Sequence, residues 1–384
     1  MARRKGIVVD AGNHNRIHCP VSIELDASAV SNPARLGLAL AGADTTVQVD
    51  ANGEKVKLTW LINKLGKGKS KTFDIRSKRS LNHKSGVELV DDEGEKVSVF
   101  LNGKLLTNYY YGEQYPRPFL HPLNGPYNKT VTRDYPLPGG PEGEREDHPH
   151  HRSVWTAWGE LNGTDNWSEQ EGHARQVHQG FEVMQQGPVY GKLVARNHWV
   201  SNKGKKVCEE IREITFYNNP AATRMIDYNV TFIATEGPLH FQDTKEGGIL
   251  SVRVASSMDV PVGGLITNGY NGLDEKETWG KRAPWCDYSG MAHKKHVGVA
   301  IFDHPDNFRY PTYWHVRNYG LMTANPFGLS YFYGDKARDG GHKVGKGEEF
   351  AFKYRLIVHK DDPESADVSE RFHDFITPPD VTFG

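Results

Sequence analysis

The residues best suited to acid/base chemistry lie in the segment Asp147-His148-Pro149-His150-His151-Arg152. Its six residues include three histidines, a carboxylate and an arginine. Histidine titrates near neutral pH, at about 6.5, so it can give or take a proton under physiological conditions. Arginine can hold a carboxylate, or an oxygen on which negative charge develops during a reaction. The segment is therefore a candidate acid/base site.

Metal binding and a purely structural loop are two other interpretations of this segment. On an extended chain, residues i and i+2 face the same way. His148 and His150 would then point together as metal ligands, while His151 would point away. The candidates for a further ligand are Asp243, Glu246 and His315. The spacing matches no strict metal motif, so no cofactor is expected, although a divalent metal stays compatible with the sequence.

Two more segments carry residues of the same types. Asp243-Thr244-Lys245-Glu246 directly precedes a strand-like run that ends in Arg253. Further along, Trp314-His315-Val316-Arg317 is also strand-like, which puts His315 and Arg317 on one face. Each set alone is also typical of a charged turn or of the solvent face of an edge strand. Together with the histidine-rich segment they predict one composite site.

A scaffold of strands must position these segments. In residues 350–358, Phe350, Phe352, Tyr354, Leu356 and Val358 alternate with other residues and would share one face. Many similar short runs follow one another with almost no helical pattern between them. This excludes a parallel α/β fold and predicts a mainly β fold, a large antiparallel β-sandwich.

Only one helix is predicted, near the end of the chain. Asp362 would be its N-cap, Pro363 would occupy the first helical position, and the helix would run over residues 364–376. Residues 1–100 are predicted to form an N-terminal β region, either a small accessory unit or part of the same sandwich. Residues 101–384 would form the main sandwich that carries the site. The polar residues 70–78 are expected to be an exposed connection.

Composition excludes several classes of function. The chain has 384 residues and a net charge of −1, which gives no electrostatic reason to bind nucleic acid. No apolar run approaches the roughly 20 residues of a membrane helix. Cys19, Cys208 and Cys286 are far apart and form no CxxC pair, so neither a disulfide framework nor a cysteine zinc site is expected. We expect a cytoplasmic protein, unless a signal peptide has been removed, and a homo-oligomer is compatible with the sequence.

An ordered series of motifs runs from about residue 110 to about residue 335. The motifs are YPRP at 115–118, PLNGP at 122–126, VTRDYP at 131–136, DHPHHR at 147–152, NG at 162–163, DTKEG at 243–247, WGKR at 279–282, WHVR at 314–317 and NPFG at 325–328. The series resembles the bacterial PmoA-like family, often labelled "methane oxygenase PmoA". That label is a misnomer, because a membrane monooxygenase subunit consists of apolar transmembrane helices and this chain is polar.

The resemblance implies carbohydrate chemistry, because the family occurs beside sugar oxidoreductases and other carbohydrate-degrading genes. At the level of the fold it implies a galactose-mutarotase-like supersandwich, whose concave face binds sugars with histidine, arginine and acidic residues. The leading hypothesis is therefore a carbohydrate-active enzyme that cleaves a glycoside by general acid/base chemistry. It would be a hydrolase, or a lyase or hydratase acting on an oxidised keto-sugar. The alternatives are a sugar epimerase or mutarotase-like enzyme, a non-catalytic sugar-binding protein, and a metal-dependent oxygenase.

This hypothesis assigns roles to named residues. The predicted catalytic residues are His148, His151, Lys245, Glu246 and His315. The predicted substrate-binding residues are His121, Arg133, His150, Arg152, Trp167, Asp243, Arg253, Trp285 and Arg317. A pair of carboxylates for ordinary glycoside hydrolysis would have to come from Glu246 with Asp243 or Asp147. The expected partner is a carbohydrate or glycoside, with no nucleic acid and no membrane.

Overall fold

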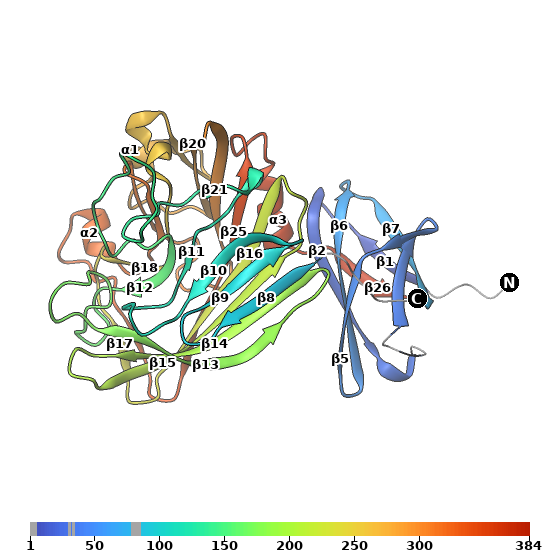
Figure 1. Ribbon diagram of the computed structural model, residues 1–384, viewed down its shortest axis with the longest axis horizontal. Helices are drawn as coiled ribbons and strands as arrows, with labels where there is room; N and C mark the ends of the chain where they lie inside the picture. Colours follow the sequence, from blue (N-terminus) through green and yellow to red (C-terminus); the bar gives the residue numbers. More distant parts are fainter. Residues whose placement is uncertain (1–5, 30–31, 33–34, 78–85) are drawn as a thin grey trace.

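The chain folds into a small and a large β-sandwich that lie side by side (Figure 1). The computed structural model describes residues 6–29, 32, 35–77 and 86–384. In both sandwiches the strands pair antiparallel.

The small sandwich consists of the first seven strands and the last one. One sheet has the order β26-β1-β7-β3-β4 and the other β2-β6-β5. In β6, Val56, Leu58, Trp60 and Ile62 are buried while Lys57 between them is exposed, the alternation of a half-buried strand. The bounds are β1 (Gly6–Asp10), β2 (Arg16–Asp26), β3 (Leu36–Leu40), β4 (Ala43–Thr45), β5 (Val47–Asn52), β6 (Lys55–Leu65), β7 (Ser70–Ser77) and β26 (Asp380–Phe383).

The prediction that residues 70–78 form an exposed connection is wrong for residues 70–77, which form β7 between β1 and β3. Phe73 explains the strand, because its side chain is 2% exposed and packs edge-on against Trp60 in the core of the small sandwich. One buried aromatic side chain therefore outweighs the polar composition of the stretch. Residue 78 lies outside the described residues.

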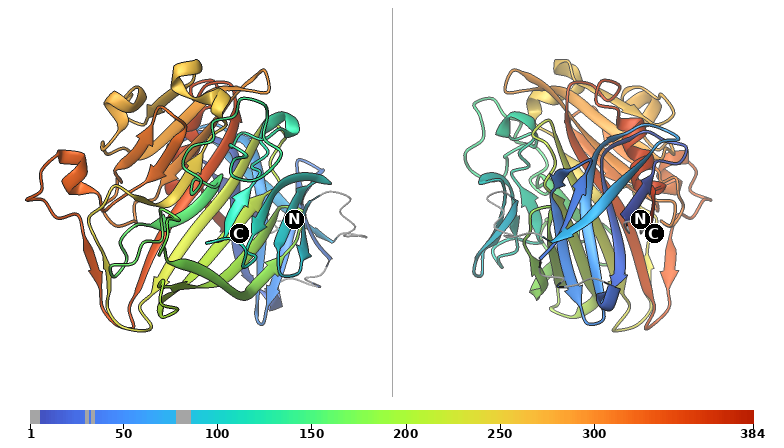
Figure 2. Two further views of the ribbon diagram at one scale, coloured as in Figure 1. Left: turned by 60° about the vertical axis from the view of Figure 1, so that its left-hand side comes forward. Right: turned by 90° about the vertical axis from the view of Figure 1, so that its right-hand side faces the viewer.

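Two eight-stranded sheets form the large sandwich (Figure 2). The front sheet has the order β22-β23-β18-β12-β11-β10-β9-β8, and the back sheet has the order β13-β14-β15-β16-β25-β21-β20-β19. The front-sheet bounds are β8 (Val87–Asp92), β9 (Lys96–Leu101), β10 (Lys104–Tyr110), β11 (Phe119–His121), β12 (Val154–Trp158), β18 (Gly247–Arg253), β22 (Trp314–Arg317) and β23 (Leu321–Ala324). The back-sheet bounds are β13 (Arg175–Gln185), β14 (Tyr190–Val200), β15 (Lys206–Tyr217), β16 (Thr223–Ile233), β19 (Leu265–Asn268), β20 (Trp285–Ala292), β21 (Lys295–Asp303) and β25 (Glu349–Lys360).

The main hydrophobic core fills the space between the front and back sheets. In β25, Phe352, Tyr354, Leu356 and Val358 are buried in this core on one face of the strand. Their alternation confirms the strand predicted over residues 350–358. The prediction of a mainly β fold with a large antiparallel sandwich is also confirmed. A two-stranded sheet of β17 (Leu239–Phe241) and β24 (His342–Val344) completes the strands.

The predicted C-terminal helix is present as α3 (Val368–Ile376), but it begins later than the sequence indicated. Asp367, with a φ of 54°, is the residue before the helix, and this left-handed conformation separates α3 from residues 362–366. Asp362 instead caps a turn, because its Oδ1 accepts a hydrogen bond from the Ser365 N–H at 2.8 Å. Two further short helices, α1 (Asp274–Thr278) and α2 (Leu329–Tyr333), were not predicted.

The end of the chain ties the two sandwiches together. Arg16 of β2 is 1% exposed, and its Nη1 donates to Asp374 of α3 at 3.3 Å and to the Thr377 carbonyl at 2.6 Å. After α3 the chain continues into β26, which pairs with β1. Because β8 and β9 belong to the front sheet, we propose that two domains divide between residues 77 and 87 rather than near residue 100.

Candidate functional site

The three polar segments singled out in the sequence meet on the outer face of the front sheet. His315 lies opposite Thr323, Thr323 opposite Ser251, and Ser251 opposite Trp155. Residues that lie opposite one another share a face of a sheet, as do residues two apart along one strand. Arg253, two residues after Ser251, is therefore on the same face as His315.

Arg133 shapes the loop that carries the histidine-rich segment. Its side chain is fully buried. Its Nη1 donates to the carbonyls of Arg145 at 3.1 Å and Asp147 at 2.7 Å, and its Nη2 donates to the carbonyl of His148 at 2.9 Å. Because the loop itself takes these donors, the predicted role of Arg133 in binding substrate is corrected to that of holding the loop.

Asp147 links the loop to the sheet. Its Oδ1 accepts hydrogen bonds from Arg133 Nη1 at 2.6 Å and from Arg253 Nη2 at 2.7 Å, and both arginines are fully buried. Burial by itself raises the pKa of this carboxyl. The charges of Arg253 and His148 lower the pKa by more than burial raises it, so the net shift is downward. Asp147 is therefore an ionised anchor for two buried cations.

His151 is held as a neutral ring with a defined tautomer. Its Nδ1 lies 3.0 Å from Arg253 Nη1, and since a guanidinium can only donate, Nδ1 is the acceptor. The ring proton is then on Nε2. Burial, followed by the neighbouring cationic groups, lowers the pKa of His151 well below 6.5. The ring stacks on Trp155 with centroids 5.3 Å apart.

His315 shows the same arrangement on β22. Its Nδ1 accepts a hydrogen bond from the indole Nε1 of Trp279 at 2.9 Å, which again leaves the proton on Nε2. Burial, with the charges of Lys245 and Arg317, lowers the pKa of His315 to about 3. Among the described residues, Nε2 of His151 and Nε2 of His315 have no hydrogen-bond partner, and the two residues are 1% and 3% exposed. Two neutral imidazole N–H groups are thus available on this face.

His148 is the more exposed neighbour of His151, with a side chain 39% exposed. The ring stacks on His151 at 4.8 Å and on Tyr319 at 5.0 Å, in both cases nearly parallel. The prediction that His148 pairs with His150 and that His151 points away is wrong. His148 has a φ of 45° and its carbonyl accepts from the His151 N–H at 3.0 Å, so the segment is a turn rather than an extended strand.

Charged side chains surround these rings at the surface. Lys245 and Glu246 form an ion pair with side chains 36% and 46% exposed. Arg317 is one-third exposed, pairs with Glu275 at 3.3 Å and lies over the ring of Tyr319. The charge of Lys245 adds to the effect of burial in lowering the pKa of His315. Burial, together with the charges of Glu246 and Asp147, raises the pKa of Tyr319. The predicted catalytic set and Arg253 and Arg317 are therefore brought to one surface.

A family model matches residues 96–373, which cover the large sandwich from β9 to most of α3. The chain belongs to this family. It is described as a family of unknown function, DUF6807, and nothing in the match supports the methane oxygenase label. No curated protein matches the chain. The structure describes no helix long and apolar enough to cross a membrane within residues 6–29, 35–77 and 86–384.

Two solved structures show a distant likeness in fold. One is an α-galactosidase from Lactobacillus brevis, with a TM-score of 0.34 and 9% identity over 77% of this chain and 42% of that one. The other is a GalM/aldose epimerase homologue from C. elegans, with a TM-score of 0.32 and 8% identity over 72% of this chain and all of that one. Similarities this low carry neither activity nor substrate over to this member of DUF6807.

Other predicted substrate-binding residues brace the loops. Arg152 donates to both carboxylate oxygens of Glu169, at 3.1 and 2.7 Å, and Arg117 pairs with the same carboxylate at 3.2 Å. Trp167 is 1% exposed and packs against Trp155. These contacts favour structural roles for Arg152 and Trp167 over the predicted contacts with a ligand.

His121 and Asp243 are also engaged. His121 lies beside Asp134 at 3.4 Å, and burial lowers its pKa to about 4. One oxygen of Asp243 accepts from the N–H groups of Ser330 at 2.9 Å and Gly340 at 2.7 Å, so this carboxylate holds the loop around α2. These contacts favour structural roles over the predicted contact with substrate.

Trp285 and His150 complete the predicted set. Trp285 is 9% exposed and lies in a separate core with Phe302 and Phe372, between the back sheet and α3. Its predicted role in the site is therefore wrong. His150 does remain in the cluster, edge-on to His151 with centroids 4.4 Å apart, and burial lowers its pKa to about 3.

The described residues contain no group of three or more His, Cys, Asp or Glu side chains placed to hold a metal ion. The rings of His148 and His150 are 5.7 Å apart and nearly perpendicular. The Nδ1 atoms of His151 and His315 already accept hydrogen bonds from protein donors. The DHPHHR segment therefore does not supply the ligand set that a metal would need.

Three residues that shape the site were absent from the predicted set. Tyr319 and Trp279 stood close to predicted residues in the sequence, but only the fold shows that they contact His148 and His315. Asp259 lies behind Arg253, is 2% exposed, and has a pKa raised by burial to about 6. No motif surrounds Asp259, so nothing in the sequence could have pointed to it.

Proposed function

We propose that this protein is a carbohydrate-active enzyme that cleaves a glycoside of an oxidised keto-sugar by proton transfer next to the keto group. The observation that carries the proposal is the pair of neutral imidazoles, His151 and His315, each with Nδ1 accepting and Nε2–H available. A neutral imidazole is a good donor to a carbonyl oxygen that becomes an enolate, because its N–H can polarise the carbonyl without losing the proton.

The remaining polar groups fit the other steps. Glu246 would remove the proton from the carbon next to the keto group, and the C–H electron pair would form an enolate whose oxygen accepts from His151 or His315. Collapse of the enolate then forms a carbon–carbon double bond and breaks the glycosidic C–O bond at the next carbon. The departing oxygen takes a proton, and His148 is the exposed histidine suited to provide it. Addition of water across the double bond then gives the free keto-sugar, so the two stages together hydrolyse the glycoside.

Ordinary glycoside hydrolysis is less well supported. It needs one carboxylic acid that holds a proton and a second, ionised carboxylate. Asp147 is kept ionised by Arg133 and Arg253, and its pKa is lowered. Asp243 is held by backbone N–H groups. Only Glu246 then remains of the carboxylates named from the sequence, which is enough for a proton-abstracting base and too few for the paired mechanism.

A sugar derivative suits this surface because it mixes ring faces with charged groups. Tyr319 and His148 are partly exposed and stack on each other with centroids 5.0 Å apart, which gives this surface an aromatic part beside its charged groups. Lys245, Glu246 and Arg317 can bind hydroxyl groups. Carbohydrate chemistry is also what the resemblance to the PmoA-like family implies.

A cytoplasmic location and a homo-oligomeric state remain predictions.

A pair of aryl glycosides tests the proposal. One carries a keto group on the sugar ring, and its otherwise identical partner carries the ordinary hydroxyl. We expect the protein to release the aryl alcohol from the keto-glycoside only, and release to fall at least tenfold in Glu246→Gln and in each of His148→Ala, His151→Ala and His315→Ala. His293→Ala, in the exposed turn between β20 and β21, is the matched control. Equal release from both glycosides, or full turnover by the folded variants, would refute the proposal.

Epimerisation is the second candidate, because it begins with the same proton abstraction. Return of the proton to the other face of the enolate would invert the carbon without breaking the glycosidic bond. The same assay separates the two, since an epimerase would convert the keto-glycoside without releasing the aryl alcohol.

A further inference from the structure

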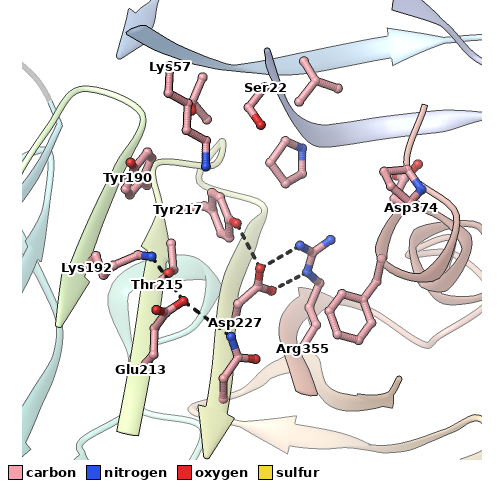
Figure 3. A pocket seen from close by; sticks show the side chains of 16 residues that line it. Ser22, Lys57, Tyr190, Lys192, Glu213, Thr215, Tyr217, Asp227, Arg355 and Asp374 are labelled. Carbon is pink, nitrogen blue, oxygen red and sulfur yellow. Dashed lines mark hydrogen bonds and ion pairs between the residues drawn. The ribbon is translucent and has the colours of Figure 1, made fainter. Parts of the chain in front are cut away.

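A cavity of about 340 Å³ lies between the two sandwiches. Its floor is the outer face of the back sheet, its roof is formed by β2 and β6, and the end of α3 together with Pro378 closes one side (Figure 3). The front-sheet site is on the other side of the main hydrophobic core. The cavity is thus a separate place in the molecule, at the junction of two units, where ligand sites often occur.

The carboxylates that line this cavity are already engaged by the protein. Asp227 accepts from Arg355 Nε at 2.6 Å, from Arg355 Nη2 at 2.9 Å and from the Tyr217 hydroxyl at 2.9 Å. Glu213 pairs with Lys192 at 3.1 Å. Asp374, at the side that the end of α3 closes, accepts from Arg16 and from the Ile17 N–H.

The donors that line the cavity are not all engaged. Lys57 has no ion pair or hydrogen bond within the described part of the chain, and Figure 3 shows its ammonium group directed from the roof toward the floor. Its two cross-strand neighbours are Glu24 and Asp50, and Asp50 accepts from the Tyr190 hydroxyl at 2.6 Å. Arg355 is 5% exposed, and its Nη1, directed away from Asp227, has no partner among the described residues. The same is true of Thr59 Oγ1, whose residue is also 5% exposed.

The cavity thus has more unpaired donors than unpaired carboxylates, and this difference indicates the kind of ligand. A buried guanidinium nitrogen and a buried hydroxyl have no acceptor in the described part of the protein, and the exposed ammonium group of Lys57 can bind a further one. The geometry points to a binding site for a small hydroxylated carboxylic acid, the chemical class of the sugar acids. Its carboxylate binds Lys57 and reaches toward Arg355 Nη1, while its hydroxyl groups meet Glu213 and Thr215 on the floor.

Size and charge favour a carboxylate over a phosphate. A cavity of about 340 Å³ is at the lower end of the range for small-ligand sites, which suits a molecule the size of one sugar. Only one nitrogen of Arg355 is free, because Asp227 takes the other two, so the fork that binds phosphate with two parallel bonds is unavailable. One ammonium group and one nitrogen match the two oxygens of a carboxylate.

The experiment measures binding of D-gluconate to the full chain by calorimetry and by the rise in Tm. D-glucose, which has the hydroxyl groups without the carboxylate, and inorganic phosphate are the comparison ligands. The variants are Lys57→Gln and Thr59→Val, with Lys64→Gln as the control, because Lys64 is exposed on the same strand and does not line the cavity. Neither Lys57 nor Thr59 belongs to the front-sheet site, so activity on keto-glycosides should be unchanged.

We expect gluconate to bind wild-type protein and Lys64→Gln equally, to raise Tm by mass action, and to bind Lys57→Gln about tenfold more weakly or worse. Glucose should bind much more weakly than gluconate. Three results would each overturn the inference: no binding of gluconate, equal binding by Lys57→Gln and Lys64→Gln, or binding of phosphate without gluconate. Because keto-glycoside turnover is measured separately, failure here is distinct from failure of the proposed enzyme function.

Discussion

Replacing Asp147 by asparagine should destabilise the large sandwich, because this carboxylate is shared by two fully buried arginines. Arg133 Nη1 and Arg253 Nη2 both donate to Oδ1, at 2.6 and 2.7 Å. Removing one partner of a buried ion pair typically costs about 3–5 kcal/mol. The Asp147 side chain is 30% exposed, and asparagine keeps an acceptor oxygen, so we expect about 2–3 kcal/mol.

Thermal unfolding followed by circular dichroism measures this loss. For a domain of this size the expected decrease in Tm is roughly 4–12 °C. The matched control is Asp306→Asn, which removes a 2.7 Å ion pair with Lys353 that lies at the surface, with the aspartate side chain 63% exposed. This control should change Tm little, because exposed pairs are screened by water and salt. Equal shifts in the two variants would refute the view that Asp147 anchors the loop.

The effect of Asp147 should also depend on pH. Burial raises the pKa of this carboxyl, but Arg253 and His148 lower it by more, so in the folded protein it lies below the ordinary 3.8. The stabilisation is therefore complete above pH 3.8 and is lost as the pH falls below that value. The difference in Tm between wild type and Asp147→Asn should persist at neutral pH and shrink in that acid range.

Three further predictions concern other residues. Trp279→Phe removes the donor to His315 Nδ1, so kcat on the keto-glycoside should fall about tenfold, equivalent to about 1.4 kcal/mol, while KM changes little. Burial lowers the pKa of His359, but Asp287 raises it by more, so in the folded protein the pKa lies above 6.5. The ion pair with Asp287 therefore stabilises the fold fully below pH 6.5, and this stabilisation is lost as the pH rises further. Between about pH 6 and pH 9, Tm of His359→Gln should fall less than Tm of wild type. Trp285→Ala should destabilise by about 3–5 kcal/mol through the cavity it leaves, with KM unchanged, and a raised KM would return Trp285 to the site.

The sequence predicted which polar segments lie together on the front sheet, but it did not reveal the contacts between them. Alternation in residues 350–358 was enough to predict β25, because one face of that strand is buried and the signal is local. The contact between His151 and Arg253 joins residues 102 positions apart. Such a contact depends on strand order and register, which a single sequence does not specify.

Charged and aromatic residues were the least predictable. Arg152 in the sequence looks the same whether it binds a ligand or pairs with Glu169, and the partner is supplied by a loop with no recognisable pattern. Trp285 was misassigned because a single sequence does not show which sheet a strand joins, and β20 lies in the back sheet, away from the front-sheet site. His148 and His150 were paired by the rule for extended chains, which fails where His148 has a positive φ.

In the proposed reaction the front-sheet site removes a proton from the carbon next to a keto group. The most direct measurement is the mass of the sugar product formed from a keto-glycoside in D2O, after a reaction time too short for uncatalysed exchange. Elimination followed by hydration should place one deuterium on the carbon next to the keto group, and Glu246→Gln should abolish both product and label. A product that forms at the full rate without deuterium at that carbon would contradict the claim.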